Sequence, residues 1–282
     1  MHMPRLGLGT FRLQGRQAID SVRTGLELGY RHIDTAQIYG NEAEVGSALA
    51  DSGIERDEVF VTTKIWTANL GGEVLAPSLK ESLRKLRLEQ VDLTLVHWPS
   101  HGGAVPLRET MEALLAAREA GLTGAIGISN FPVALMREAI DAVGAHNIAT
   151  NQVELHPYLQ NRQVAAFARE SGIHLTAYMP LAYGKVMDDP VIRAIAARLQ
   201  ATAAQVTLAW LLAKGHAVIP SSTRRAHLEG NLQAPGLALA PQDLAAFESL
   251  DRGERLVDPE FAPDWDRVIR PVPGSGGRSR SG

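Results

Sequence analysis

The sequence contains no cysteine. This absence excludes disulfides, thiolate metal sites and a cysteine nucleophile, and it is typical of a protein kept in a reducing compartment. Glycines and charged residues interrupt every long apolar run, and residues 1–5 lack the apolar segment of a signal peptide. We therefore expect a protein of the cytoplasm, with no membrane partner.

The sequence also lacks a large excess of charge of either sign. It has 28 basic and 31 acidic residues, which give a net charge of −3. Nucleic-acid binding needs a concentrated basic face that neutralises phosphates, so this composition argues against a nucleic-acid partner. A basic stretch rich in Gly, Ser and Arg, residues 267–282, cannot bury apolar surface. We expect this tail to be disordered or derived from a cloning vector.

Short β-rich runs alternate along the chain with segments of helical spacing. We assign eight such runs to residues 6–10, 32–36, 59–64, 93–97, 125–129, 151–155, 175–178 and 218–221. Strands separated by helices form parallel sheets, and eight such units are the number that closes into a barrel. The sequence therefore predicts an α/β fold, a single-domain (β/α)8 TIM barrel spanning residues 1–266.

Several helices have sequence signals of their own. Leucines at positions 75, 79, 83 and 86 form an apolar stripe with helical spacing. Thr202 and Gln205 have the spacing of a capping box, which predicts a helix starting after Thr202. Pro241 is a residue that the first turn of a helix accepts.

Four polar side chains of complementary chemistry lie at or just after the ends of three neighbouring predicted strands. Asp34 and Tyr39 follow the second strand, Lys64 ends the third and His97 ends the fourth. The active site of a barrel of this kind lies at the carboxyl ends of its strands. We therefore expect these four residues to meet on one rim.

This set of residues fits the reduction of a carbonyl group, which needs a hydride at carbon and a proton at oxygen. A phenol with a pKa of about 10 holds its proton tightly, and a nearby ammonium lowers that pKa. Tyr39 is then the general acid, Lys64 lowers its pKa, Asp34 anchors Lys64, and His97 orients the carbonyl oxygen. Each residue alone has a commoner explanation, as a surface ion pair, a rim tyrosine or a core histidine. The combination carries the prediction.

Seven short strings occur in the order found in the aldo-keto reductase family, and the chain resembles that family from about residue 4 to residue 265. Within the family it is similar to the bacterial reductases of 2,5-diketo-D-gluconate and methylglyoxal. The strings are Gly-Leu-Gly-Thr-Phe at 7–11, Asp-Thr-Ala-Gln-Ile-Tyr-Gly-Asn-Glu at 34–42, Lys-Ile-Trp at 64–66, His-Trp-Pro at 97–99, Gly-Ile-Ser-Asn-Phe at 127–131, Asn-Gln-Val-Glu at 151–154 and Ala-Tyr-Met-Pro-Leu at 177–181.

The resemblance implies NADPH as the cofactor and assigns contacts to its nicotinamide. Ser129, Asn130 and Gln152 match residues that hydrogen-bond the carboxamide, and Tyr178 matches the aromatic residue that stacks on the ring. From the sequence alone, without the resemblance, the favoured role of Ser129 and Asn130 is a helix cap before Pro132.

At the adenosine end the resemblance is less complete. Ser221 stands where relatives commonly carry Lys, and His227 stands where they carry Arg; Arg224 can replace the lost charge, so we still expect NADPH rather than NADH. The residues assigned to this end of the cofactor are Ser221, Ser222, Thr223, Arg224 and Asn231.

Three aromatic residues follow the first, third and fourth strands and are expected to form the walls of the substrate pocket: Phe11, Trp66 and Trp98. Their alternative role is core packing. Residues 261–265 are expected to fold over this pocket, as the C-terminal loop does in the family. No metal site is predicted, because Pro99 and the glycines that follow prevent a helix from presenting His97 and His101 together.

The sequence thus predicts an NADPH-dependent reductase of small aldehydes, α-ketoaldehydes such as methylglyoxal, or keto-sugar acids, acting as a monomer on a small-molecule substrate. Two alternatives remain open. One is a non-catalytic, cofactor-binding member of the family, which the intact set of four residues argues against. The other is a barrel lyase or isomerase using Lys64 as a Schiff base, which neighbouring Asp34 disfavours by keeping Lys64 protonated.

Overall fold

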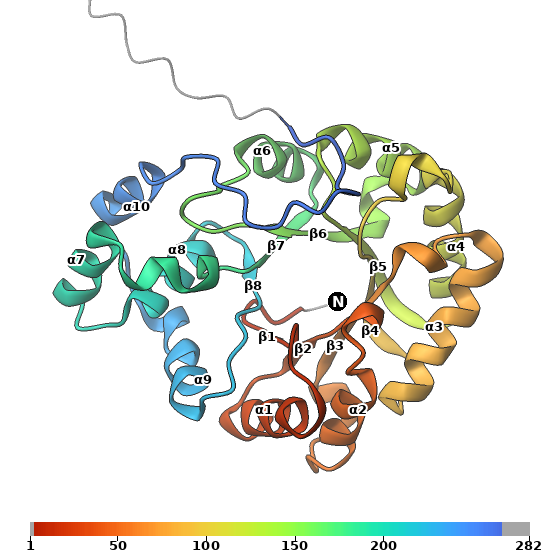
Figure 1. Ribbon diagram of the computed structural model, residues 1–282, viewed down its shortest axis with the longest axis horizontal. Helices are drawn as coiled ribbons and strands as arrows, with labels where there is room; N and C mark the ends of the chain where they lie inside the picture. The colour runs from red at the N-terminus through yellow and green to blue at the C-terminus, as the bar shows by residue number, and fades with distance from the viewer. Residues whose placement is uncertain (1–2, 267–282) are drawn as a thin grey trace, which may run out of the picture.

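The computed structural model describes residues 3–266, so the predicted tail at 267–282 lies outside the described residues. Its centre is one eight-stranded sheet, and its helices form an outer layer around that sheet (Figure 1). The strands follow one another in chain order, and every neighbouring pair is parallel. The predicted α/β fold with eight parallel strands is confirmed.

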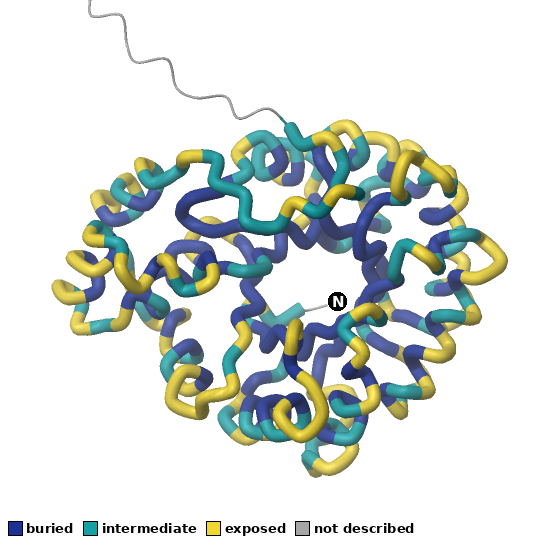
Figure 2. Tube along the Cα trace, viewed as in Figure 1, coloured by how far each residue is buried: buried dark blue, intermediate teal, exposed yellow. Residues whose placement is uncertain are grey.

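The strands are short at the two edges of the sheet and longer in its middle. They are β1 (Leu8–Gly9), β2 (His32–Asp34), β3 (Phe60–Ile65), β4 (Val91–Val96), β5 (Thr123–Ser129), β6 (Ile148–Glu154), β7 (His174–Tyr178) and β8 (Ala217–Val218). All six residues of β3 are buried, as expected for a parallel sheet covered on both faces. Figure 2 shows the same for the inner ring of strands, where dark blue predominates.

The regular ladder runs from β1 to β8 and does not continue as a strand pair from β8 back to β1. Where these edges meet, Leu6 forms one parallel bridge with Val218, and the N–H of Gly7 donates to the carbonyl of Val218 at 2.8 Å. The backbones of the two edges lie close together, since a Cβ on Gly9 would be 2.7 Å from the Ile219 carbonyl oxygen. The predicted regular closure is therefore corrected to a curled sheet with a short edge contact, because each edge strand has only two residues.

Ten α-helices surround the sheet within the described part of the chain. They are α1 (Gly15–Leu28), α2 (Glu42–Ala50), α3 (Gly72–Leu86), α4 (Leu107–Glu119), α5 (Val133–Val143), α6 (Arg162–Ser171), α7 (Pro190–Arg198), α8 (Ala203–Ala213), α9 (Arg225–Leu232) and α10 (Pro241–Glu248). None of these helices is long and apolar enough to cross a lipid bilayer.

The local sequence signals for helices are found where they were expected. Thr202 and Gln205 form a capping box at the start of α8, and Pro241 is the first residue of α10. The leucine stripe of α3 is buried against the sheet. The capping box and the proline act between neighbouring residues, so they do not depend on the rest of the fold, whereas the leucine stripe acts through its burial.

Candidate active site

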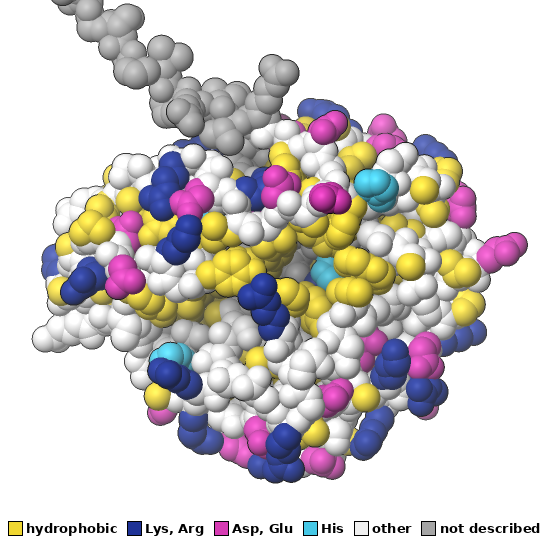
Figure 3. Space-filling model, in the orientation of Figure 1, with side chains coloured by type: hydrophobic (Ala, Val, Ile, Leu, Met, Phe, Trp, Pro, Cys, Tyr) yellow, Lys and Arg dark blue, Asp and Glu magenta, His cyan; other side chains and the backbone are white. Residues whose placement is uncertain are grey.

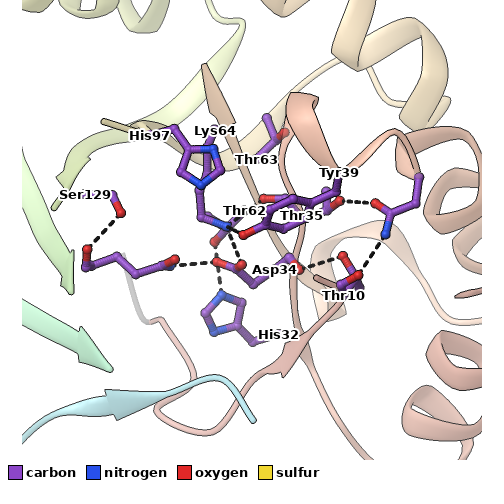
Figure 4. Close-up of polar contacts among 12 residues, drawn as sticks. Thr10, His32, Asp34, Thr35, Tyr39, Thr62, Thr63, Lys64, His97 and Ser129 are labelled. Atoms are coloured by element: carbon purple, nitrogen blue, oxygen red, sulfur yellow. Dashed lines mark hydrogen bonds and ion pairs between the residues drawn. The ribbon is translucent and has the colours of Figure 1, made fainter. Parts of the chain in front are cut away.

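A buried ion pair lies at the carboxyl ends of β2 and β3. The ammonium of Lys64 donates to Oδ1 of Asp34 at 2.5 Å, and the two residues are 0% and 1% exposed (Figure 4). The register explains the contact: Asp34 pairs with Thr62, and Lys64 lies two residues further along the same face of β3. Lys64 also donates to the Thr35 carbonyl at 2.9 Å and to the Tyr39 hydroxyl at 3.3 Å.

Tyr39 lies in a short 3-10 turn, η1 (Gln37–Tyr39), just after β2. Gly40 ends the turn with a φ of 67°, a left-handed conformation that glycine adopts without strain. The buried side chain of Asn41 donates to the carbonyls of Thr10 and Leu13 and ties the turn to the loop after β1. The tyrosine hydroxyl is therefore presented to Lys64 by a firmly held loop.

The electrostatics of this group differ from the sequence-based expectation in one respect. Burial raises the pKa of Tyr39 and outweighs the lowering by Lys64, so the net pKa of the phenol lies above its usual range. The expectation of a net lowering was wrong because it did not include burial. Burial also lowers the pKa of Lys64, but Asp34 and Tyr39 raise it more, so the pKa of Lys64 stays above its usual range.

His97 directly follows β4 and completes the predicted set of four. Its ring lies edge-on to those of Tyr39 and Trp66, with centroid distances of 5.6 and 5.4 Å. Burial, followed by the nearby Lys64 charge, holds its pKa well below the usual range, so the ring is neutral at pH 7. Its Nδ1 is buried without a hydrogen-bond partner among the described residues. The structure thus brings all four residues to one rim.

The residues predicted to meet the nicotinamide form a second hydrogen-bonded group beside the first. Ser129, at the end of β5, donates to the Gln152 carbonyl at 2.8 Å. Asn130 donates to the His97 carbonyl at 3.0 Å and accepts from the Tyr178 hydroxyl at 2.7 Å. The structure therefore brings the predicted carboxamide residues and the predicted stacking tyrosine together.

The alternative role of Ser129 and Asn130 as a helix cap does not hold. Helix α5 begins at Val133 and its N-cap residue is Pro132, which has no side-chain cap. The N–H of Val133 donates instead to Asp266, at 3.0 Å. Asn130 has a φ of 65°, a left-handed conformation that asparagine tolerates better than most residues, and its side chain turns toward the site.

Gln152 has a contact that the sequence did not suggest. Its amide Nε2 donates to Oδ2 of Asp34 at 2.8 Å, so Asp34 is held by Lys64 on one oxygen and by Gln152 on the other. The two residues are 118 positions apart, and no local pattern relates them. The sequence signal available for this contact was that Gln152 is a polar residue within a predicted buried strand.

Gln37 is a second residue that the sequence reasoning missed. Its Oε1 accepts from the backbone N–H of Trp66 at 2.8 Å, and its Nε2 donates to Ser78 and Ser82 on α3. It therefore fixes one wall of the pocket relative to the turn that carries Tyr39. Its position inside the family-like string at 34–42 was the only signal.

The loop between β8 and α9 holds the residues assigned to the adenosine end. Arg224 is the N-cap residue of α9, and its N–H donates to the Ser222 hydroxyl. Ser221, Ser222 and Thr223 lie in the loop that leads to it. Asn231 differs, since it is only 4% exposed on α9, the helix whose Leu228 carbonyl accepts the Tyr30 hydroxyl at 3.0 Å.

Aromatic side chains surround the hollow above the four polar residues. Figure 3 shows this hollow at the centre of one face, with apolar side chains around it and a histidine inside. Phe11 is 45% exposed, and its ring lies 5.1 Å from that of Tyr39. Phe261 contacts both Trp66 and Trp98, at 5.8 and 5.5 Å between centroids. Residues 261–265 therefore cover the pocket, as expected.

Comparison with known proteins identifies the class of this molecule. The sequence model of the Aldo/keto reductase family matches residues 5–252, which is most of the chain. The chain belongs to the aldo/keto reductase family, and this places it among the oxidoreductases.

The chain is similar to its relatives over all or nearly all of their length. Methylglyoxal reductase DkgB of Escherichia coli O157:H7 is 59% identical over 267 residues, which cover 94% of this chain and 100% of the relative. A solved structure assigned by name to a 2,5-diketo-D-gluconic acid reductase B superposes with a TM-score of 0.91 at 45% identity, covering 94% of each chain. The aldose reductase of Schistosoma japonicum gives a TM-score of 0.88 at 29% identity, covering 94% and 96%.

Proposed function

We propose that the protein is an NADPH-dependent reductase that converts small aldehydes, α-ketoaldehydes such as methylglyoxal, or keto-sugar acids into alcohols. One observation carries the proposal: a tyrosine hydroxyl, a fully buried lysine and a buried aspartate form one hydrogen-bonded chain, beside a neutral histidine. The family and the DkgB relatives support the same reaction class.

The chain's own residues account for the proton that the reaction needs. When a reduced nicotinamide is bound, it supplies a hydride to the carbonyl carbon, and the electron pair of the C=O bond moves to oxygen. Tyr39 donates its hydroxyl proton to that oxygen, and Lys64 stabilises the tyrosinate that remains until solvent returns the proton. Because the pKa of Tyr39 lies above its usual range, the phenol is fully protonated at pH 7 before each turnover.

His97 is suited to hold the substrate oxygen in line with Tyr39. A neutral imidazole carries one N–H, and a donor at this place fixes a carbonyl oxygen without adding a second charge next to Lys64. Asp34 holds Lys64 toward Tyr39, and Gln152 holds Asp34. The same ion pair disfavours the Schiff-base alternative, since it keeps the lysine protonated and therefore non-nucleophilic.

The residues around the site fit a nicotinamide cofactor. The hydroxyl of Ser129 and the amides of Asn130 and Gln152 offer both donors and acceptors, which match a primary carboxamide. Tyr178, partly exposed at the end of β7, offers a ring face for stacking. Arg224 at the start of α9 is the group we assign to the 2′-phosphate of NADPH, because a helix N-terminus and an arginine both favour that anion.

We further propose a monomer in the cytoplasm that acts on small molecules and binds neither nucleic acid nor membrane. The mildly acidic composition supports the part of this proposal that concerns nucleic acid, because it offers no large basic excess to neutralise phosphates. We also infer that the Leu6–Val218 bridge and the backbone hydrogen bonds beside it close the curled sheet into a (β/α)8 barrel.

The decisive experiment separates cofactor binding from chemistry. Tryptophan fluorescence is titrated with NADPH and with NADH, and the loss of nicotinamide absorbance is then followed after methylglyoxal is added. We expect tight NADPH binding and substrate-dependent oxidation for the wild type. Tyr39→Phe should keep cofactor binding and lose about 10²-fold or more in turnover, since only the proton donor is removed. Wild-type turnover in that variant would exclude Tyr39 as the acid.

A further inference from the structure

The last residue of β6, Glu154, is a fully buried carboxylate that the proposed reaction does not use. Its exposed fraction is 0%. Oε1 accepts the backbone N–H of Leu256 at 2.7 Å, and Oε2 accepts that of Val257 at 2.9 Å. His156 completes the set, with its Nε2 2.8 Å from Oε1. Burying a carboxylate away from water costs free energy unless hydrogen-bond donors surround it. The partners of Glu154 supply those donors, so the site is formed to hold its carboxylate.

The partners of Glu154 belong to the end of the described chain, about 100 positions away. We call residues 251–266 the C-terminal segment. Figure 1 shows this segment, in dark blue, crossing above β6 and β7. Its first part lies along the loop after β6, where the Tyr158 carbonyl accepts the N–H groups of Arg252 and Glu254. Further along the segment, the Glu154 carboxylate accepts the N–H groups of Leu256 and Val257.

Beyond Val257 the C-terminal segment carries the aromatic cover of the substrate pocket. Phe261 contacts Trp66 and Trp98, and Trp265 lies 6.0 Å from Trp98 between ring centroids. The guanidinium of Arg255 lies 3.6 Å from the ring centroid of Trp265. The segment therefore brings apolar surface to the opening above the catalytic residues.

Few polar contacts hold this aromatic part in place. Between described residues, three hydrogen bonds join positions 256–266 to the rest of the chain: two end on Glu154 and one links Asp266 to the N–H of Val133. Leu256 also packs against the hydrophobic core, and beyond it Phe261 and Trp265 contact Trp66 and Trp98 through their rings. Ring contacts tolerate sliding better than hydrogen bonds do. Glu154 is thus the polar anchor on the N-terminal side of Phe261, and the hydrogen bond between Asp266 and Val133 lies on its C-terminal side.

We propose that Glu154 is a positioning residue for substrate binding: its carboxylate fixes the peptide groups of Leu256 and Val257 and thereby holds Phe261 over the pocket. Glu154 lies two residues beyond Gln152 on β6, so one strand end supports both the catalytic aspartate and the cover of the pocket. The binding role rests on the proposed reductase function, whereas the anchoring role does not.

The test replaces Glu154 by glutamine, which keeps the shape of the side chain. One carboxylate oxygen becomes an NH2 group, which then faces a backbone N–H that it cannot accept. Hydrogen–deuterium exchange of a peptide containing Leu256 and Val257 should become about tenfold faster or more, since charge-assisted hydrogen bonds are lost. KM for methylglyoxal should rise several-fold, while kcat changes by less than about twofold, because the four catalytic residues are untouched. In Phe261→Ala the same Glu154 substitution should add nothing further to KM.

Glu42→Gln is the matched control, since Glu42 is also a buried carboxylate (2% exposed) but bonds Thr63 on β3, away from the C-terminal segment. It should leave exchange at Leu256 and Val257 as in the wild type.

If Glu154→Gln does not fold, Val257→Pro removes one donor from the other side and should raise KM in the same way. Unchanged exchange in Glu154→Gln, or faster exchange with an unchanged KM, overturns the proposal. Absence of reductase activity in the wild type would overturn the proposed function and leave the exchange result to decide the anchor.

Discussion

Replacing Lys64 by methionine removes the buried ammonium and keeps an unbranched side chain that fills similar space. Three hydrogen bonds disappear: those to Asp34, to the Thr35 carbonyl and to the Tyr39 hydroxyl. Asp34 is then a buried carboxylate held only by Gln152. Removing one partner of a buried ion pair costs about 3–5 kcal/mol in the free energy of unfolding, because the remaining charge stays out of water.

The second substitution needed to interpret this loss is Asp34→Asn in the same chain. Asparagine keeps an acceptor for Gln152 and removes the uncompensated charge. We therefore expect the Lys64→Met/Asp34→Asn variant to recover about half or more of the lost unfolding free energy. Both variants should reduce methylglyoxal about 10²–10⁴-fold more slowly than the wild type, since neither can stabilise the tyrosinate of Tyr39.

Urea denaturation and steady-state NADPH oxidation measure the two effects separately. If the double variant regains stability but not activity, Lys64 has two distinct functions, one toward Asp34 and one toward Tyr39. Equal stability of the single and double variants would contradict the assignment of the cost to an unpaired Asp34. Reduction at the wild-type rate by either variant would refute the role of Lys64 in proton transfer.

Three further predictions concern the cofactor, the pH dependence of stability and the packing. Arg224→Ala should raise KM for NADPH about tenfold and leave KM for NADH nearly unchanged; equal effects in steady-state kinetics would exclude Arg224 from the 2′-phosphate site. Burial, with two neighbouring cations, lowers the pKa of His216 to about 4 from 6.5, so its neutral form stabilises the fold above about pH 6.5 and that stability is lost as the pH falls toward 4. Chemical denaturation across this range should show about 3 kcal/mol of pH dependence that His216→Gln lacks. A Cβ on Gly46 would lie 2.5 Å from the Lys85 carbonyl oxygen, so Gly46→Ala should lower the melting temperature by several degrees, whereas Gly236→Ala, with nothing within 4 Å, should not.

Local sequence determined much of the fold because its signals act between near neighbours. The alternation of β-rich runs and helical stripes predicted eight parallel strands. The capping box at Thr202 and Gln205 was readable because its two hydrogen bonds join residues three apart. The sequence also indicated Asp34, Tyr39, Lys64 and His97, since parallel strands place their carboxyl ends at one rim.

The tertiary structure alone decided which distant groups meet and what burial does to them. Gln152 reaches Asp34, and Glu154 reaches Leu256 and Val257, across roughly 100 positions that no periodicity relates. The net pKa of Tyr39 depends on burial, which opposes the effect of its nearest charge and exceeds it. The contact between the two edges of the sheet depends on backbone approach at Leu6 and Val218. Each of these outcomes is set by distances through space, and a linear sequence specifies them only once the chain has folded.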